Sequence, residues 1–445
     1  MFRILSAFRR LNSFQIIVLG FAFVILLGAG ILMLPVSSAD GSWTPFVNAL
    51  FTSVTSVCVT GLVVCDTGTY WSSFGHAVIL LLIQTGGLGV VTISASFTIL
   101  SGKKIGLSQR SIMAESVAAP QLRGVVRLTG FIVRVTLGIE LIGALLMAPV
   151  FCRDFGLCRG LWMSLFHSVS AFCNAGIDLL GVRGAYSSLT SYAYDPLINL
   201  VIILLIVIGG IGFLTWDDIY RNRHHISRYR MQSKVILSYS LVLIFIPAIL
   251  FFFLEFQDIP AGKRILVSLF QSVTTRTAGF NTADLSSMRE SGQLLMILLM
   301  LVGGSPGSTA GGIKTTTLAV LISCATAVFA RKDSPEMFKR RIIPDIVATA
   351  IAILFMYTSL GILCAMTLSI LESLPLMPCL FEAISALATV GLSFGITPTL
   401  SVPSKLILIT FMFIGRVGGL TIIYATMSGY RIRCGKFPQE KISVG

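Results

Sequence analysis

Four short segments that each end in glycine carry the clearest chemical potential in this 445-residue sequence. They are Val59-Thr60-Gly61, Asn174-Ala175-Gly176, Thr277-Ala278-Gly279 and Thr389-Val390-Gly391. The side chains differ among these glycine segments while the glycine stays, so the groups they share are main-chain carbonyls. Rings of carbonyl oxygens can replace the hydration shell of a cation such as K⁺, and glycine permits the backbone angles that this requires. The segments therefore predict a cation site built from backbone.

Each glycine segment closes a short helical run that begins with a Leu-Phe pair. The glycine follows the phenylalanine by ten residues after Phe51, Phe166 and Phe381, and by nine after Phe270. This shared spacing indicates an internal repeat. Each run is shorter than the roughly 20 residues that cross a bilayer and lies between two longer apolar runs, as in a pore loop. Four connecting helices with ordinary glycine caps are the alternative, but capping does not require the Leu-Phe start.

The composition places these repeats in a membrane. Hydrophobic residues make up 55% of the chain and charged residues 12%, whereas a soluble domain has about 25% charged residues. We predict an all-α polytopic membrane protein with four helix–pore-helix–helix repeats around a pseudo-fourfold pore. The units span residues 1–101, 102–222, 223–333 and 334–445 and form one membrane domain. Their long apolar runs are residues 14–36 and 74–100, 128–151 and 192–214, 235–256 and 294–330, and 346–370 and 406–427.

The basic residues are distributed unevenly along the chain, whose net charge is +14. The two tails and the three loops between units contain 22 of the 33 Lys and Arg residues, and the loops within units contain seven. By the positive-inside rule, both termini and the loops between units are predicted to be cytoplasmic. This pattern follows a lipid bilayer and not a nucleic acid. The basic residues of the tails are Arg3, Arg9, Arg10, Arg431, Arg433, Lys436 and Lys441.

Acidic residues follow the glycine segments on the side predicted to be outside. We expect them either to concentrate cations at the mouth of the pore or to be ordinary solvated loop charges. They are Asp66, Asp178, Asp284 and Glu290.

Glycine-rich patterns recur within the closing run of every unit. Residues 86–89 and 209–212 are expected to let helices pack closely, and residues 415–419 carry a similar glycine pattern. In the third unit the pattern contains five glycines and a proline, which disfavour a continuous helix, so we predict a break inside the membrane. It is not a phosphate loop, because Ile313 occupies the position of the lysine. The residues assigned to the break are Gly303, Gly304, Ser305, Pro306, Gly307, Ser308, Thr309, Ala310, Gly311, Gly312 and Lys314.

Charged residues inside apolar runs are the remaining candidates. A central arginine costs about 2.5–3.5 kcal/mol in a membrane helix. We therefore predict that Arg416 faces the interior as an electrostatic barrier and anchor near the break. An ion pair with Glu140 or Glu382 is the structural alternative. Arg276 directly precedes the third glycine segment and is predicted to brace it by donating to loop carbonyls.

The glycine segments and the long apolar runs together resemble the potassium-translocating subunits of the Ktr/Trk/HKT superfamily over nearly the whole chain. The resemblance implies K⁺ uptake across the cell membrane, with residues 303–312, Lys314 and Arg416 as a gate below a selectivity filter. Potassium-conducting members have glycine at the first filter position and sodium-selective members have serine, so Gly61 resembles the potassium type. The resemblance also implies a homodimer, a separate KtrA-like cytosolic nucleotide-binding regulatory ring, and Na⁺ as an activator.

No catalytic or cofactor-binding pattern is visible among the four histidines and nine cysteines, so we predict no enzyme activity and no cofactor beyond the transported K⁺. Cys152 and Cys158 either pair outside the cell or remain thiols. The rival hypothesis is a secondary symporter that couples K⁺ to H⁺ or Na⁺. It requires a titratable group inside the membrane, for which Glu140 and Glu382 are the candidates.

Overall fold

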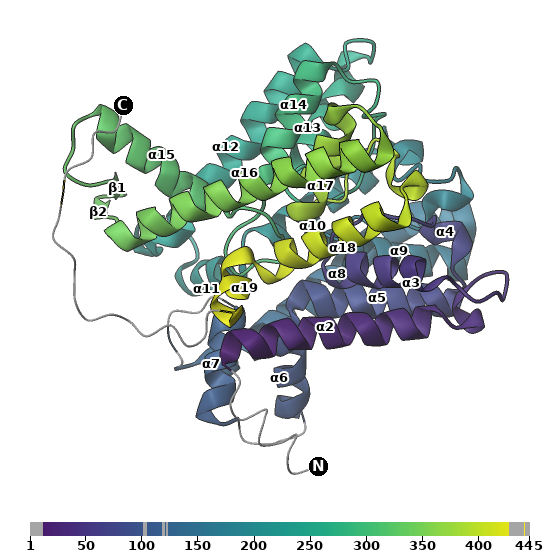
Figure 1. Ribbon diagram of the computed structural model, residues 1–445, viewed down its shortest axis with the longest axis horizontal. Coiled ribbons are helices and arrows are strands. Elements are labelled where there is room, and N and C mark those ends of the chain that lie inside the picture. Colours follow the sequence, from purple (N-terminus) through teal and green to yellow (C-terminus); the bar gives the residue numbers. More distant parts are fainter. Residues whose placement is uncertain (1–11, 101–104, 118–120, 122, 427–439, 441–445) are drawn as a thin grey trace.

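The computed structural model of the chain describes residues 12–100, 105–117, 121, 123–426 and 440. The basic residues of both tails lie outside this range. Within it the regular secondary structure is helical apart from one two-stranded antiparallel hairpin (Figure 1). The hairpin strands are β1 (Glu336–Met337) and β2 (Arg340–Arg341). The predicted all-α polytopic architecture is confirmed.

A long apolar helix opens each repeat. In the described chain, these four are the single helices that are long and apolar enough to cross a membrane. Most of their surface faces outward: only 17% of the most apolar window of the fourth opening helix is buried within the protein. This outward apolar surface suits contact with lipid. The opening helices are α2 (Ser13–Leu32), α8 (Val125–Phe155), α12 (Met231–Leu254) and α16 (Pro344–Glu372).

A shorter helix follows each opening helix and packs against it. The phenylalanine of every Leu-Phe pair is fully buried, which explains why the pair recurs. Burying a Phe side chain contributes about 1.5–3 kcal/mol and fixes the depth of the short helix in the repeat. These pore helices are α3 (Phe46–Val57), α9 (Leu157–Phe172), α13 (Ala261–Thr274) and α17 (Leu376–Leu387).

The closing run of each repeat is broken. We expected residues 74–100 and 192–214 to be continuous, but α5 and α6 meet at 97° and α10 and α11 at 96°. The bends follow from Gly89 and Gly212, whose φ angles of 86° and 91° end a right-handed helix. Gly418 separates α18 from α19 in the same way, with φ 89°. The break predicted in the third closing run is confirmed between α14 and α15.

The pieces of the closing runs are α5 (Ser73–Leu88) and α6 (Val90–Leu100), α10 (Pro196–Gly210) and α11 (Phe213–Asn222), α14 (Glu290–Leu301) and α15 (Thr315–Phe329), and α18 (Val402–Val417) and α19 (Gly419–Thr426). The connections contain α4 (Thr67–Tyr70), α7 (Leu107–Ser116), η1 (Pro35–Ser37), η2 (Leu180–Val182), η3 (Thr190–Tyr192), η4 (Ile226–Arg228) and η5 (Thr397–Thr399).

The glycines before the bends have the packing role that we predicted. A Cβ atom at Gly86 would lie less than 3.0 Å from the carbonyl of Val57, and one at Gly209 would lie as close to the carbonyl of Phe172. Both carbonyls belong to the last residue of a pore helix. Close contact between a closing helix and the pore helix of its own repeat therefore depends on a missing side chain.

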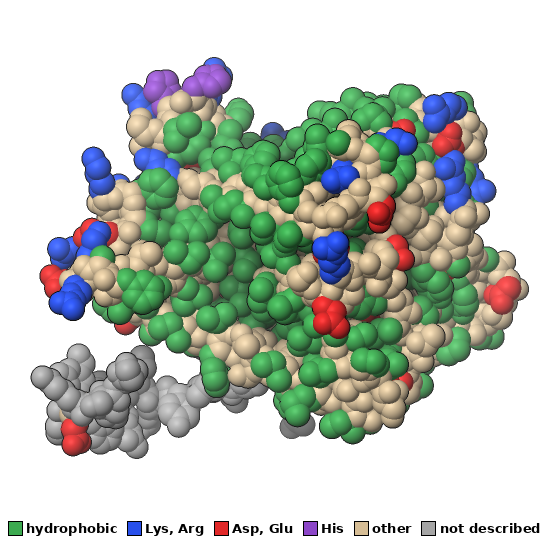
Figure 2. Space-filling model, turned by 90° about the horizontal axis from the view of Figure 1, so that it is seen from above, with side chains coloured by type: hydrophobic (Ala, Val, Ile, Leu, Met, Phe, Trp, Pro, Cys, Tyr) green, Lys and Arg blue, Asp and Glu red, His purple; other side chains and the backbone are tan. Residues whose placement is uncertain are grey.

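Charged and apolar side chains occupy different zones of the surface. Figure 2 shows a band of apolar side chains between charged side chains at the left end of the view and charged side chains spread over its right half. Cys152 and Cys158 are both free thiols, so of the two alternatives the structure has the unpaired one.

Candidate functional site

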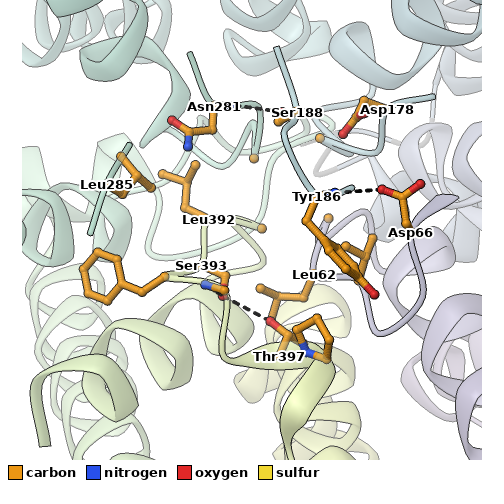
Figure 3. A pocket seen from close by; sticks show the side chains of 18 of the residues that line it. Leu62, Asp66, Asp178, Tyr186, Ser188, Asn281, Leu285, Leu392, Ser393 and Thr397 are labelled. Carbon is orange, nitrogen blue, oxygen red and sulfur yellow. Dashed lines mark hydrogen bonds between the residues drawn. The ribbon is translucent and has the colours of Figure 1, made fainter. Parts of the chain in front are cut away.

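The four glycine segments meet at one pocket of about 240 Å³. Figure 3 shows that its wall takes residues from all four repeats, from Leu62 and Asp66 in the first to Ser393 and Thr397 in the fourth. Hydrogen bonds tie neighbouring repeats together at the rim: the Tyr186 N–H donates to the Asp66 carboxylate at 2.8 Å. The glycines that line the pocket are Gly61, Gly176, Gly279 and Gly391.

The glycines form a closed ring, each packed against the segment of the next repeat. A Cβ atom at Gly61 would lie 2.5 Å from the carbonyl oxygen of Ala175 in the second repeat. One at Gly279 would lie 2.7 Å from the oxygen of Val390 in the fourth. Cβ atoms at the other two glycines would lie less than 3.0 Å from carbonyls as well: Gly176 faces the oxygen of Ala278, and Gly391 faces that of Thr60. The sequence of contacts runs from repeat 1 through 4 and back to 1, so the four segments surround a common axis.

The backbone of the segments is unusual in the same way in every repeat. The residue two positions before each glycine is left-handed although it has a side chain, with φ between 52° and 64°. This conformation costs about 1–2 kcal/mol per residue and persists where the surrounding structure enforces it. Because the left-handed residue recurs at the same position in all four repeats, it belongs to the common structure of the repeats. The residues are Val59, Asn174, Thr277 and Thr389.

A hydroxyl from each pore helix holds the segment in place, a role that the sequence analysis missed. The Gly61 N–H donates to the Thr55 hydroxyl at 3.0 Å, and the Gly391 N–H donates to the Ser385 hydroxyl at the same distance. In the middle repeats the bond is made one residue further along: Ser170 donates to the carbonyl of Ile177, and Thr274 to that of Phe280. The four hydroxyls lie four residues after the phenylalanine of the Leu-Phe pair, and this spacing was the available signal.

The 303–312 segment lies directly against two of the glycine segments. A Cβ atom at Gly311 would lie less than 3.0 Å from the Thr389 hydroxyl, and one at Gly303 would lie 3.1 Å from the Thr277 methyl group. The segment is anchored to the α10–α11 bend, since the Ser305 N–H donates to the Gly210 carbonyl at 2.9 Å. The backbone groups freed by the break thus find protein partners, as they must inside a membrane.

Two cationic side chains also bind this segment. The Arg416 guanidinium donates to the carbonyl of Thr309 and to that of Gly87, the latter at 3.2 Å. The Lys314 ammonium donates to the carbonyls of Ala310 and Gly311 at 2.8 and 3.3 Å. Arg416 therefore bridges the 303–312 segment and the end of α5, which is the position expected of an anchor.

The alternative interpretation of Arg416 is not what the structure has. Among the described residues, no ion pair joins it to an acidic side chain. Glu140 accepts a hydrogen bond from the Gln84 amide at 3.2 Å, and Glu382 accepts one from the Thr397 hydroxyl. The interpretation of Arg276 was wrong, because its guanidinium donates to Ser240 at 3.2 Å and not to loop carbonyls. Arg276 is directed toward the opening helix α12.

Three of the four acidic candidates, Asp66, Asp178 and Asp284, line the pocket; Glu290 starts α14 instead. Burial raises the pKa of Asp178 to about 6, and the nearby charge of Asp66 adds to this shift. The Leu180 N–H, which donates to its carboxylate at 2.8 Å, opposes it. The negative charge that Asp178 contributes at the mouth is therefore complete only well above pH 6.

These features define a class: a polytopic helical membrane protein whose four repeats close a ring of backbone around an axis. Comparison with known proteins places it further. Residues 6–429 match the TrkH family, described as cation transport proteins. The chain belongs to this TrkH/Ktr family of cation transporters, and it is not an enzyme.

Similar proteins cover almost the whole chain. A potassium/sodium uptake protein, NtpJ, from Enterococcus hirae is 38% identical over 98% of both chains. The Ktr system potassium uptake protein B of Bacillus subtilis is 38% identical over 92% of both chains. The crystal structure of the potassium transporter TrkH from Vibrio parahaemolyticus superposes with a TM-score of 0.72 over 94% of this chain and 86% of that one, at 17% identity. That similarity supports the fold.

Proposed function

We propose that this protein takes up K⁺ across the cell membrane through the ring of glycine segments. The observation that carries the proposal is the closed ring, in which each glycine packs on a carbonyl of the next repeat. Rings of carbonyl oxygens are the groups that replace the hydration shell of K⁺. The relatives described as potassium uptake proteins support the choice of ion. Each of the four units, residues 1–101, 102–222, 223–333 and 334–445, contributes one quarter of this filter.

The 303–312 segment is the proposed gate. It lies against the third and fourth glycine segments and is held by hydrogen bonds from Arg416 and Lys314. A segment held by hydrogen bonds to flanking side chains can move without unfolding a helix. Its displacement would open the path below the filter.

Control of the gate is assigned to a separate cytosolic subunit. Several relatives are named as parts of a Ktr system, which supports a separate partner protein. From the family resemblance we take this partner to be a nucleotide-binding regulatory ring, and Na⁺ to be an activator. We propose that the protein works as a homodimer. Both termini and the basic loops between repeats would face the cytoplasm, where this ring could reach them.

Symport of K⁺ with H⁺ or Na⁺ is the competing mechanism. Glu140 and Glu382 are buried, but neither lines the pocket at the glycine ring. A coupling carboxylate would need to contact the ion path, so their positions favour a channel-like mechanism.

The test is ⁸⁶Rb⁺ uptake into proteoliposomes containing the purified protein. We expect uptake that follows the membrane potential and does not depend on a pH gradient. Addition of Na⁺ should increase the rate of uptake, but Na⁺ should not be co-transported with K⁺ in a fixed ratio. Uptake that requires a pH gradient would support the symporter, and absence of any uptake by folded protein with its cytosolic partner would refute the proposal.

A further inference from the structure

A second pocket, of about 300 Å³, lies away from the ring where α11 meets the start of α8. Its floor is apolar, from Val125, Leu128 and Leu214, and its rim is basic. Three arginines from three different parts of the chain converge on that rim. They are Arg123 before α8, Arg221 near the end of α11, and Arg230 before α12.

The rim has more positive than negative charge. Arg221 pairs with Asp217, which also lines the pocket, at 2.7 Å, and Arg230 lies 3.5 Å from Asp218. Arg123 has no hydrogen bond or ion pair within the described chain. A guanidinium has five N–H donors, so each paired arginine keeps donors for a further oxygen ligand. Three arginines against the two carboxylates that pair with them leave one net positive charge, which suits an anion such as a phosphate.

The start of α8 strengthens this preference. The helix begins at Val125 after Gly124, whose φ of 84° turns the chain and which makes no side-chain cap. The first N–H groups of a helix have no partner within it and carry partial positive charge, which favours an anion.

The pocket lies at the level of a membrane surface. The helix that starts there is long and apolar enough to cross a membrane, and its 31 residues extend over about 46 Å, close to the thickness of a bilayer with its headgroups. We therefore place its first residue at headgroup level. Because α11 bends 96° from α10, it runs along that boundary. Tyr220 on α11 is 72% exposed and lies 5.4 Å from the ring of Phe131, as expected of an aromatic residue at a membrane interface.

We propose that this pocket binds the phosphate headgroup of an anionic phospholipid, with the arginines on the phosphate and the apolar floor beneath the glycerol. Basic pockets between membrane helices on the cytoplasmic side are suited to such headgroups. A soluble phosphate would satisfy the arginines but would not cover Leu128, the member of the apolar lining that is partly exposed.

The site is connected to the 303–312 segment. The N–H of Phe213, the first residue of α11, donates to the carbonyl of Gly307 at 2.7 Å. A lipid that fixes α11 against α8 therefore restrains the segment at Gly307. This second part of the inference rests on the proposed function, since it takes residues 303–312 as the gate.

The deciding experiment measures binding and needs no transport. Full-length protein in nanodiscs of phosphatidylcholine with added phosphatidylglycerol is analysed by native mass spectrometry for retained lipid. The variant with Arg123→Gln, Arg221→Gln and Arg230→Gln should bind phosphatidylglycerol about fivefold more weakly for each arginine removed. The control is Arg228→Gln, which removes an exposed arginine of the same α11–α12 connection outside the pocket.

Each outcome has a distinct meaning. Equal binding of phosphatidylglycerol by the triple variant and the control would overturn the lipid site. Displacement of the lipid by inorganic phosphate would assign the pocket to a soluble anion and overturn it as well. If the triple variant retains lipid binding but no longer responds to the cytosolic partner, the arginines belong to the interface with that partner, and the lipid site is overturned as well. Lost binding with unchanged ⁸⁶Rb⁺ flux would overturn the link to the gate.

Discussion

Replacing Gly61 by serine tests the ring most directly. Its φ of 97° is left-handed, and holding a residue with a side chain there costs about 1–3 kcal/mol. The added Cβ atom would lie 2.5 Å from the Ala175 oxygen and 3.2 Å from the Gly391 Cα atom. Both neighbours are backbone, so no side-chain rotation relieves the overlap and the carbonyls themselves must move.

The expected result is a loss of discrimination between K⁺ and Na⁺. If 1–3 kcal/mol is taken from the K⁺-bound geometry, the preference falls by about 5–150-fold. The assay compares K⁺ and Na⁺ fluxes in proteoliposomes, supported by growth of uptake-deficient cells at low K⁺. Gly395→Ser is the matched control, because Gly395 lines the same pocket with φ 87° but has no atom within 4 Å of its Cβ position. Unchanged selectivity in well-expressed Gly61→Ser, or an equal loss in the control, would refute the reasoning.

Four further perturbations test the proposed gate, the pore-helix hydroxyl Ser170, the acidic mouth of the pocket and the orientation in the membrane. Deleting residues 307–311 should raise K⁺ flux and weaken control by the cytosolic partner while selectivity stays; a folded variant that conducts no faster in liposomes would mean that the gate lies elsewhere. Ser170→Ala leaves the buried N–H and carbonyl of Ile177 without their partner, which costs about 1–3 kcal/mol, and it should lower K⁺ over Na⁺ selectivity in the same flux assay. An unchanged ratio of K⁺ to Na⁺ flux would mean that this pore-helix hydroxyl does not hold the glycine segment in place. Lowering the outer pH through 6 should reduce uptake at low K⁺ as Asp178 is protonated, and Asp178→Asn should remove this dependence. Because its pKa is raised from 3.8, ionisation above pH 6 opposes folding, so the asparagine variant should melt no lower than wild type at pH 7.5; a pH response that survives in Asp178→Asn assigns it to another group. Arg223 and Arg340 are exposed and are each replaced by a single cysteine in a background without native cysteines. These cysteines should not react with a membrane-impermeant thiol reagent applied outside, and labelling of either would contradict the predicted orientation.

The repeats and their opening helices could be predicted because their signals are local. The run expected at residues 128–151 lies within α8, and that expected at 346–370 lies within α16. Apolar length sets these helices, and length is visible in the sequence. The fully buried phenylalanine of each Leu-Phe pair likewise gives one residue a fixed role in every repeat.

The bends of the closing helices could not be predicted in the same way. Gly89 and Gly212 look like residues that tolerate close packing, and a helix can continue through such residues. What bends the chain is a left-handed φ at each of these glycines, and the presence of a glycine in the sequence permits this φ without requiring it. Arg276 was misassigned for a related reason: its neighbour in sequence is the third glycine segment, but its partner, Ser240, is on another helix.

The third repeat departs from the others at the contact on which a gate would depend. In the other repeats, the space beside Gly86, Gly209 or Gly415 is occupied by the carbonyl of the last residue of that repeat's pore helix. In the third, the space beside Gly303 is occupied by the carbonyl of Gly311, from the 303–312 segment itself.

The segment has thus entered the position where closing helix and pore helix otherwise meet. Removing it from that position breaks hydrogen bonds to Arg416, Lys314 and the α10–α11 bend, and the bond from the Thr309 hydroxyl to the carbonyl of Phe172 at the end of α9. It does not separate a pore helix from its opening helix. The glycine ring can therefore stay assembled while the 303–312 segment moves. In the proposed function, this is the physical requirement for gating without loss of selectivity.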